Sequence, residues 1–145
     1  MLRFTKRFEY GIIALRHMLN QPAGRVTSAK EISRRYNIPT EIMAKILQRL
    51  AREGFIDSSQ GSRGGYVLAK DSKRISLNDI VESIEGRPFG IVDCMTDEDC
   101  QCVQMPNCNI NEPFKVIQKQ LKIFLSGISL ADIDNEIGIQ HVTWN

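Results

Sequence analysis

The stretch TEIMAKILQRLAREGFIDSSQGSRGGYVLA, residues 40–69, joins a helical pattern directly to a hairpin pattern. A helix is expected from Thr40 to about Glu53, because apolar residues recur at steps of three and four and Gly54 is a typical C-terminal stop. Its expected buried stripe consists of Ile42, Ile46, Leu47 and Leu50. The opposite face is polar and basic and consists of Glu41, Ala44, Lys45, Gln48, Arg49 and Arg52.

A β-hairpin is expected directly after this helix. Residues 55–58 and 66–69 are short extended runs, and the segment 59–65 between them is too rich in glycine for a helix. A hairpin that follows a recognition helix is called a wing. Arg63, at its expected tip, can enter a minor groove, where the negative potential is concentrated.

Two helices are expected before residue 40. Thr5 can cap the first, which ends near the Pro22–Gly24 break, and its apolar positions are Phe8, Ile12, Leu15 and Leu19. The second begins at Thr27 or Ser28, where Ser28 and Glu31 have the spacing of a capping box. Two short helices, a tight turn and a helix with an exposed basic face are typical of a helix-turn-helix.

The pattern of elements predicts a winged helix-turn-helix that binds double-stranded DNA. In such a domain the exposed face of the recognition helix enters the major groove, where Gln and Arg can pair with base edges. The residues that we expect at the DNA are Lys6, Ser28, Thr40, Glu41, Lys45, Gln48, Arg49, Ser62, Arg63 and Gly64. A plain helical bundle with a solvated polar face is the simpler alternative, and the wing argues against it.

The distribution of charge agrees with DNA binding by the first half alone. Residues 1–74 contain 15 basic and 6 acidic side chains, a net charge of +9, whereas residues 75–145 contain 4 and 11, a net charge of −7. A basic half joined to an acidic half is expected where only the first approaches phosphates. We therefore divide the chain into a DNA-binding domain, 1–74, and a second part, 75–145.

The second part is predicted to contain two main helices around a loop. Ser76 and Asp79 form a capping pair for a helix that closes at Gly86. A longer helix, about 112–127, has its apolar stripe at Phe114, Ile117, Leu121, Phe124 and Leu125. No second core follows it, so we expect a partner chain to cover this stripe, which makes it a dimerisation helix; packing on the chain's own first helix is the alternative.

All four cysteines lie in the loop at about 90–111, in the pattern C-x5-C-x-C-x5-C. The pattern lacks the C-x-x-C knuckle that is usual in structural zinc sites, and thiolates are the standard ligands of iron–sulfur clusters. No apolar run is long enough to cross a membrane and no signal-peptide pattern is present, so we expect a reducing cytoplasm, where clustered thiols more often bind metal than form disulfides.

These motifs together resemble the iron–sulfur winged-helix transcription regulators typified by IscR, NsrR and RirA. The resemblance rests on the opening RFTKRFEYGIIAL, the helix-turn-helix, the wing end SRGGYVLAK, the segment ISLNDIVESIEG, the cysteine loop and the closing ISLADI, and it covers about residues 1–135. It implies a homodimer with one cluster in each subunit, whose state controls binding to a palindromic operator. The implied fold is mainly α with a small β wing, followed by a long C-terminal dimerisation helix.

The resemblance also implies a ligand set. The spacing of Cys94, Cys102 and Cys108 is similar to that of RirA-like members, whereas Cys94 and Cys100 match the first part of the IscR spacing. We favour the first trio, with Cys100 as the alternative ligand. A [4Fe–4S] cluster is favoured over [2Fe–2S] on the same resemblance.

The fourth ligand is expected from the partner chain. IscR-like members use a histidine three residues after the last cysteine, but this position is Asn111 here. NsrR-like members take a carboxylate from the first helix of the partner, and Glu9 occupies the matching position. Glu9 of the partner subunit is therefore our candidate; an exposed acid in a first helical turn and ligation by a fourth cysteine are the alternatives.

The two rival hypotheses are a cluster-free regulator and an enzyme. Cluster-free relatives such as CymR suggest a repressor on the same fold that responds to thiol oxidation or to a small molecule, with Cys94 or Cys100 as the reactive thiol. An enzyme is not expected, because the sequence shows no nucleophile paired with a base, no phosphate-binding glycine motif and no C-x-x-C.

Overall fold

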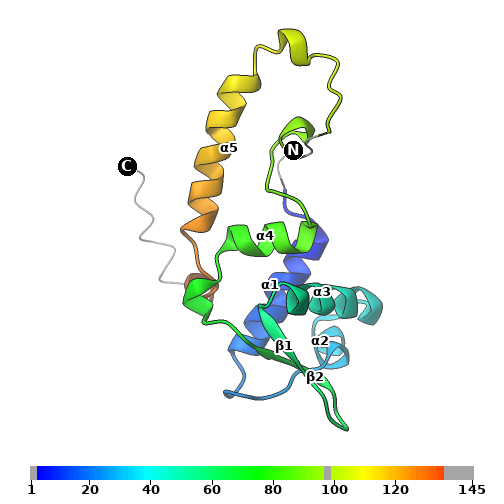
Figure 1. Cartoon of the computed structure of the whole chain (residues 1–145). Helices are drawn as coiled ribbons and strands as arrows, with labels where there is room; N and C mark the ends of the chain where they lie inside the picture. Colours follow the sequence, from blue (N-terminus) through cyan, green and yellow to red (C-terminus); the bar gives the residue numbers. More distant parts are fainter. Residues whose placement is uncertain (1–2, 97–98, 136–145) are drawn as a thin grey trace.

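The computed structural model describes residues 3–96 and 99–135 and shows a mainly helical chain with one two-stranded antiparallel sheet (Figure 1). The expected fold class is confirmed. The elements are α1 (Lys6–Leu19), α2 (Ala29–Tyr36), α3 (Thr40–Arg52), β1 (Ile56–Ser59), β2 (Gly65–Leu68), α4 (Leu77–Glu85), α5 (Asn111–Ser126) and α6 (Leu130–Asp134), with 3-10 turns η1 (Ser72–Arg74), η2 (Asp93–Met95) and η3 (Met105–Asn107).

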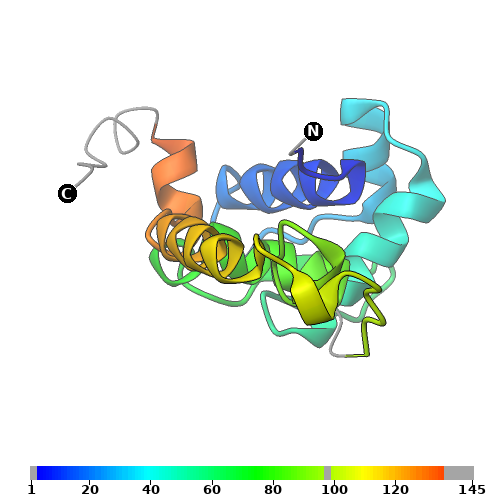
Figure 2. The same cartoon turned by 90° about the horizontal axis from the view of Figure 1, so that it is seen from above.

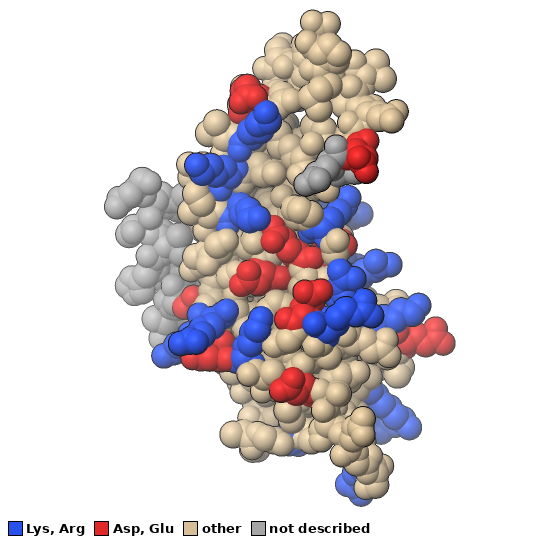
Figure 3. All heavy atoms as spheres, viewed as in Figure 1, with Lys and Arg blue, Asp and Glu red and all other residues tan. Residues whose placement is uncertain are grey.

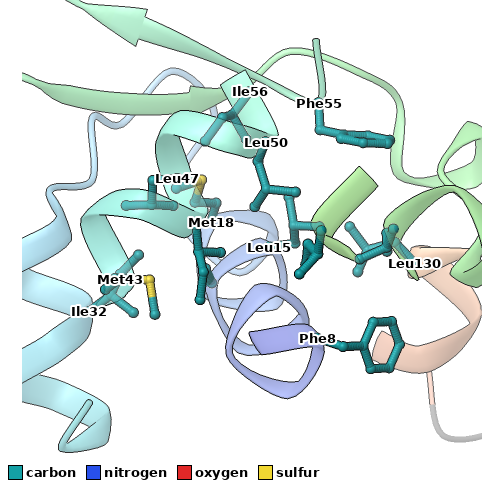
Figure 4. Packing of buried hydrophobic residues seen from close by; sticks show 14 of the residues in the cluster. Phe8, Leu15, Met18, Ile32, Met43, Leu47, Leu50, Phe55, Ile56 and Leu130 are labelled. Carbon is teal, nitrogen blue, oxygen red and sulfur yellow. The ribbon is translucent and has the colours of Figure 1, made fainter. Parts of the chain in front are cut away.

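Helix α1 is the centre of the fold. It packs against α3 and α4 and also contacts α6 and β2. Seen from above, α1 crosses the middle of the molecule, with α2 at one end and α6 at the other (Figure 2). The largest side chains of α1, α2 and α3 meet in one core, which Leu130 of α6 joins from the other side (Figure 4).

Side-chain caps begin four of the helices, and three of them, at Thr5, Ser28 and Ser76, were expected. The hydroxyl oxygens of Thr5, Ser28, Ser76 and Ser129 accept hydrogen bonds from backbone N–H groups in the first turns of α1, α2, α4 and α6. Such caps satisfy donors that no helical carbonyl can reach. Ser76 and Ser129 also form an isolated antiparallel bridge, so the starts of α4 and α6 lie side by side. The bridge therefore joins the segment before α4 to the segment that follows α5.

The two strands of the wing, at 56–59 and 65–68, are each shifted by one residue from the predicted runs 55–58 and 66–69. Strand β1 begins at Ile56 rather than Phe55, because the Phe55 N–H bonds to the Leu50 carbonyl at 3.0 Å and so belongs to the end of α3. Ser59 pairs with Gly65 at the tip end of the hairpin. A Cβ at Gly65 would lie 2.6 Å from the Thr27 carbonyl oxygen, so only glycine allows the wing to pack this closely on the segment before α2.

The buried stripe of α3 also differs from the prediction. Ile42 is 40% exposed, whereas Met43 is completely buried. Met43, Ile46, Leu47 and Leu50 therefore form the stripe, at the steps of three and four that one helix face requires. Ile42 is therefore not part of this buried stripe.

The face of α1 that packs is lined partly by small residues. Ile12 and Leu19 are half-buried, whereas Gly11 and Ala14 are buried. A Cβ at Gly11 would lie 2.0 Å from Cδ1 of Ile84, so α4 approaches the α1 backbone closely. Ile12 and Leu19, two of the predicted apolar positions, pack against the core from its edge.

Helix α5 rises away from the rest of the chain, and only its C-terminal part lies against α4 (Figure 1). Of its described residues only Leu125 is buried, and the predicted stripe residue Ile117 is 47% exposed. The sequence also predicts a weakly ordered tail up to Asn145, and residues 136–145 lie outside the described residues. No helix among those that the structure describes is long and apolar enough to span a membrane.

Candidate nucleic-acid interface and cysteine loop

The outer face of α3 presents polar and charged side chains to solvent. Thr40, Glu41, Lys45 and Gln48 are exposed, as the sequence predicted, while their neighbours Ile46 and Leu47 hold the helix on the core. Arg52 extends this face by one turn and is exposed too. The arrangement can place donors and acceptors against the base edges of a major groove.

Arg49 is positioned differently from its neighbours. Its Nε donates a hydrogen bond of 2.8 Å to the backbone carbonyl of Ser83 in α4, and Glu53 lies 3.9 Å from the same nitrogen. A Cβ at Gly86 would lie 2.5 Å from Nη2 of Arg49. The guanidinium of Arg49 therefore packs against the C-terminal end of α4.

The predicted tip of the wing is exposed. Ser62, Arg63 and Gly64 all lie in the loop between β1 and β2, and β1 packs against α3. The wing and the recognition helix thus belong to one continuous part of the molecule (Figure 1). The loop projects from the base of the molecule, where its arginine can reach past α3.

Lys6 and Ser28, the remaining predicted DNA contacts, are already engaged within the chain. The Nζ of Lys6 lies 2.5 Å from a carboxylate oxygen of Glu9, on the next turn of α1. The hydroxyl of Ser28 accepts the N–H of Glu31 at 3.1 Å as the cap of α2. The roles of Lys6 and Ser28 at the DNA stay predictions.

A buried histidine fixes α2 against α1. His17 Nδ1 lies 3.1 Å from the Tyr36 hydroxyl, and its Nε2 lies 3.2 Å from Glu31, which also accepts a hydrogen bond of 3.0 Å from Arg25. Burial would raise the pKa of Glu31, but the hydrogen bonds from His17 and Arg25 outweigh it and hold the pKa below its ordinary value. This polar cluster fixes the position of the first helix of the helix-turn-helix.

The four cysteines are half-buried, and no disulfide links them. Cys94 lies in η2, near the start of the loop, whereas Cys102 and Cys108 lie before and after η3, towards its other end (Figure 1, lime green and yellow). Among the described residues no group of three or more His, Cys, Asp or Glu side chains is close enough to hold one metal ion. The predicted ligands are thus in one loop but are not gathered.

Glu9, the predicted ligand from the partner subunit, is exposed on the first turns of α1. Its carboxylate pairs with Lys6, whose side chain is itself 74% exposed. An exposed pair of this kind contributes little to stability and is easily broken. Glu9 is therefore accessible to a second chain.

The last turn of α4 receives contacts from several segments. Glu82 accepts hydrogen bonds from Lys122 of α5 at 2.7 Å and from the N–H of Phe89, at the start of the cysteine loop, at 3.2 Å. Burial would raise the pKa of Glu82, but Lys122 and the Phe89 N–H outweigh it and hold the pKa below its ordinary value. The carboxylate form of Glu82 thus ties α4, α5 and the loop together.

This pKa shift predicts a dependence of stability on pH. Because the pKa of Glu82 is lower in the folded state, its contribution is present above the unfolded value of 4.5 and is lost as the pH falls through the folded value. Urea unfolding should show that Glu82→Gln is less stable than the wild type at about pH 7, with a smaller difference at about pH 3. A difference that stays constant with pH would contradict the prediction.

Two features of the structure were not predicted from the sequence. Glu82 was not singled out, and a glutamate in a last helical turn gives no sequence signal of its partners. Val116 and Ile123 of α5 are 61% and 56% exposed and lie off the predicted stripe. Their spacing of seven residues was the signal that could have identified a second apolar line on this helix.

The fold and the exposed faces define a winged helix-turn-helix DNA-binding protein with a cysteine loop inserted before its last long helix. The chain matches the family model Rrf2, described as iron-dependent transcriptional regulators, over residues 4–136. It therefore belongs to the Rrf2 family of transcription regulators. Members of this family bind DNA and typically form dimers.

Several solved structures share the fold at low sequence identity. The global cysteine regulator CymR of B. subtilis is 21% identical with a TM-score of 0.69, and the match covers 94% of this chain and 98% of that one. IscR of T. potens is 20% identical with a TM-score of 0.64, covering 99% and 94%. The oxidized form of CymR from Staphylococcus aureus is 17% identical with a TM-score of 0.66, covering 99% and 100%.

Proposed function

We propose that this protein is a homodimeric transcription regulator that senses nitric oxide, redox state or iron supply through an iron–sulfur cluster. One observation carries the proposal. All four cysteines lie in the loop that joins α4, which packs on the recognition helix, to the unpartnered helix α5. A change in this loop is therefore adjacent both to the DNA-binding domain and to the expected dimer interface.

The chemistry of the donor set fits a cluster, although the loop does not gather the thiols in this structure. Cys94, Cys102 and Cys108 would supply three thiolates, with Cys100 as the alternative. Their half-buried side chains are accessible, and none is locked in a disulfide. A bound cluster would cross-link the two ends of the loop and would supply iron that reacts with oxygen or nitric oxide.

Glu9 of the partner subunit is our candidate for the fourth ligand. Its exposed carboxylate is held only by a surface lysine, so ligation costs the chain little. Three thiolates with one carboxylate favour [4Fe–4S] over [2Fe–2S] by resemblance to NsrR-like members. In this arrangement each cluster would also join the two subunits.

The DNA contacts are proposed for α3 and the wing. Lys45 and Gln48 are exposed in the middle of the outer face of α3, and Arg63 is exposed at the tip of the wing. A basic wing and a polar helix face are suited to reading a minor and a major groove together. A dimer would double these contacts on a palindromic operator.

The operator response is tested by purifying the protein without oxygen and counting iron and acid-labile sulfide. We expect a brown protein with about four irons and four sulfides in each subunit. A duplex selected by this protein from a random library should then bind with a different Kd after the cluster is removed. A colourless protein that cannot be reconstituted, yet binds the selected duplex, would overturn the cluster but not the DNA-binding function.

A thiol-responsive repressor is the second candidate, because the structure keeps the four half-buried thiols apart rather than gathered. CymR, on the same fold, is known in an oxidized form. In that case reversible oxidation of Cys94 or Cys100 would replace the cluster as the signal. Iron content again separates the two candidates.

A further inference from the structure

We infer that the last turn of α4, residues 82–86, transmits the state of the cysteine loop to the recognition helix, with Glu82 and Arg49 as its positioning residues. The inference rests on the proposed function and names the part of the fold through which regulation passes. It also gives Arg49 a role between helices instead of one at the bases.

Segments that are far apart in sequence converge on this single turn. Glu82 accepts hydrogen bonds from Lys122 of α5 and from the N–H of Phe89, which opens the loop. One residue later, the Ser83 carbonyl accepts the Nε of Arg49 from α3. Thr5, at the start of α1, donates its hydroxyl to Glu85. The last turn of α4 therefore contacts the start of the loop, α5, α3 and the cap of α1.

The contact of Arg49 has a clear physical cause. The last carbonyls of a helix lack intrahelical partners and carry the negative end of the helix dipole. Arg49 supplies both a donor and a positive charge there, and its side chain is only 36% exposed. Gly86 ends α4 with a φ of +71°, and a Cβ there would lie 2.5 Å from the guanidinium. The end of α4 is thus shaped around the arginine.

The loop side of the junction is held by two tethers. One is the bond from Phe89 to Glu82, and the other joins the Ile91 N–H to the Gln118 side chain of α5 at 3.2 Å. A loop that closes around a cluster or around modified thiols must pull on residues 89–91. Because Glu82 holds this segment and Lys122 together, the pull reaches α4 and, through Ser83, turns or shifts α3.

The test uses Glu82→Gln, Arg49→Gln and the double variant. Glu112→Gln is the matched control, since it removes the charge of an exposed carboxylate that pairs with Lys115 on α5, away from the junction. For each protein the Kd of the selected duplex is measured with the loop cluster-loaded and metal-free. We expect each junction variant to reduce the ratio of these two constants by about fivefold or more, the double variant no further, and the control not at all.

A second readout does not depend on a cluster. Amide hydrogen exchange in residues 40–52 is compared before and after N-ethylmaleimide alkylates the thiols of the metal-free protein. Alkylation should change exchange in the wild type and the control, and the two junction variants should suppress this change, while unchanged exchange in α2 shows that the fold is intact.

The outcomes separate the inference from the proposed function. The wild-type protein could lack a cluster, while alkylation still alters amide exchange in α3 and the junction variants suppress this change. That result would overturn the proposed cluster and support the junction. A wild-type response that both variants retain in full would overturn the junction and leave the regulator intact. The junction would also be overturned if neither the amide exchange of α3 nor the Kd of the selected duplex changed with the state of the loop in the wild-type protein.

Discussion

Cys102→Ala is expected to abolish the cluster and with it the response of DNA binding to the signal. Cys102 belongs to the favoured trio with Cys94 and Cys108, and a carboxylate with two thiolates is a poor ligand set for an iron–sulfur cluster. Iron and sulfide should fall at least about tenfold in this variant, and the absorption of the brown protein should disappear. The Kd of the selected duplex should no longer depend on treatment with nitric oxide or oxygen.

Cys100→Ala is the matched control, because it removes a thiol from the same loop, two residues away. We expect this variant to keep its iron, its colour and its response. If Cys100→Ala loses the cluster and Cys102→Ala keeps it, the ligand set is the IscR-like trio instead. If both variants keep the wild-type response and neither contains iron, the result supports the thiol-responsive alternative. The reactive thiol would then be Cys94 or Cys108.

The architecture could be predicted from the sequence because its signals are local. The side chains of Ser76 and Asp79 determine the start of α4 whatever surrounds them, and both hydrogen bonds of their capping box are present. The wing follows equally from a glycine-rich segment between two extended runs. Even the one-residue error at Phe55 is local, because its N–H completes the end of α3.

The faces of the helices were harder to predict, since they depend on what packs beside them. The steps in α3 allow a stripe that begins at Ile42 or at Met43, and the sequence does not say where α1 and α2 will lie. The charge of Arg49 suggested a contact with DNA, and the sequence gives no sign of its hydrogen bond to the end of α4. Its contact joins residues 34 positions apart, and no short-range pattern encodes it.

For the cysteine loop, the sequence likewise identifies the residues but not their arrangement in space. Its ligands are recognisable by residue type and spacing, while the described residues include no group of three or more such side chains that could hold one metal ion. The cluster itself would supply the free energy that gathers them, as metals do in many small sites. On the face shown in Figure 3, charged side chains of both signs gather over the middle of the molecule, whereas the top, where the cysteine loop lies in Figure 1, is mostly uncharged.

Ile123→Glu is expected to separate the dimer and to lower operator affinity strongly. Val116 and Ile123 lie seven residues apart on one line of α5, and Ile110 and Ile117 lie seven apart on a second line; all four are exposed. Both lines are exposed, so they can pack against the same helix of a second chain. Burying a glutamate from each subunit there leaves charges without partners, which should raise the dimer Kd roughly 100-fold or more.

Sedimentation equilibrium measures this change, and binding of the selected palindromic duplex should weaken in parallel, because a monomer reaches only one half-site. The fold of the single chain should be retained, since Ile123 is 56% exposed and adds little to the core. Lys115→Glu is the control: it also adds negative charge to an exposed position of α5, about a quarter-turn around the helix from Ile123. Dimers of equal stability in both variants would mean that α5 does not form the interface, and the exposed apolar lines would then need another partner.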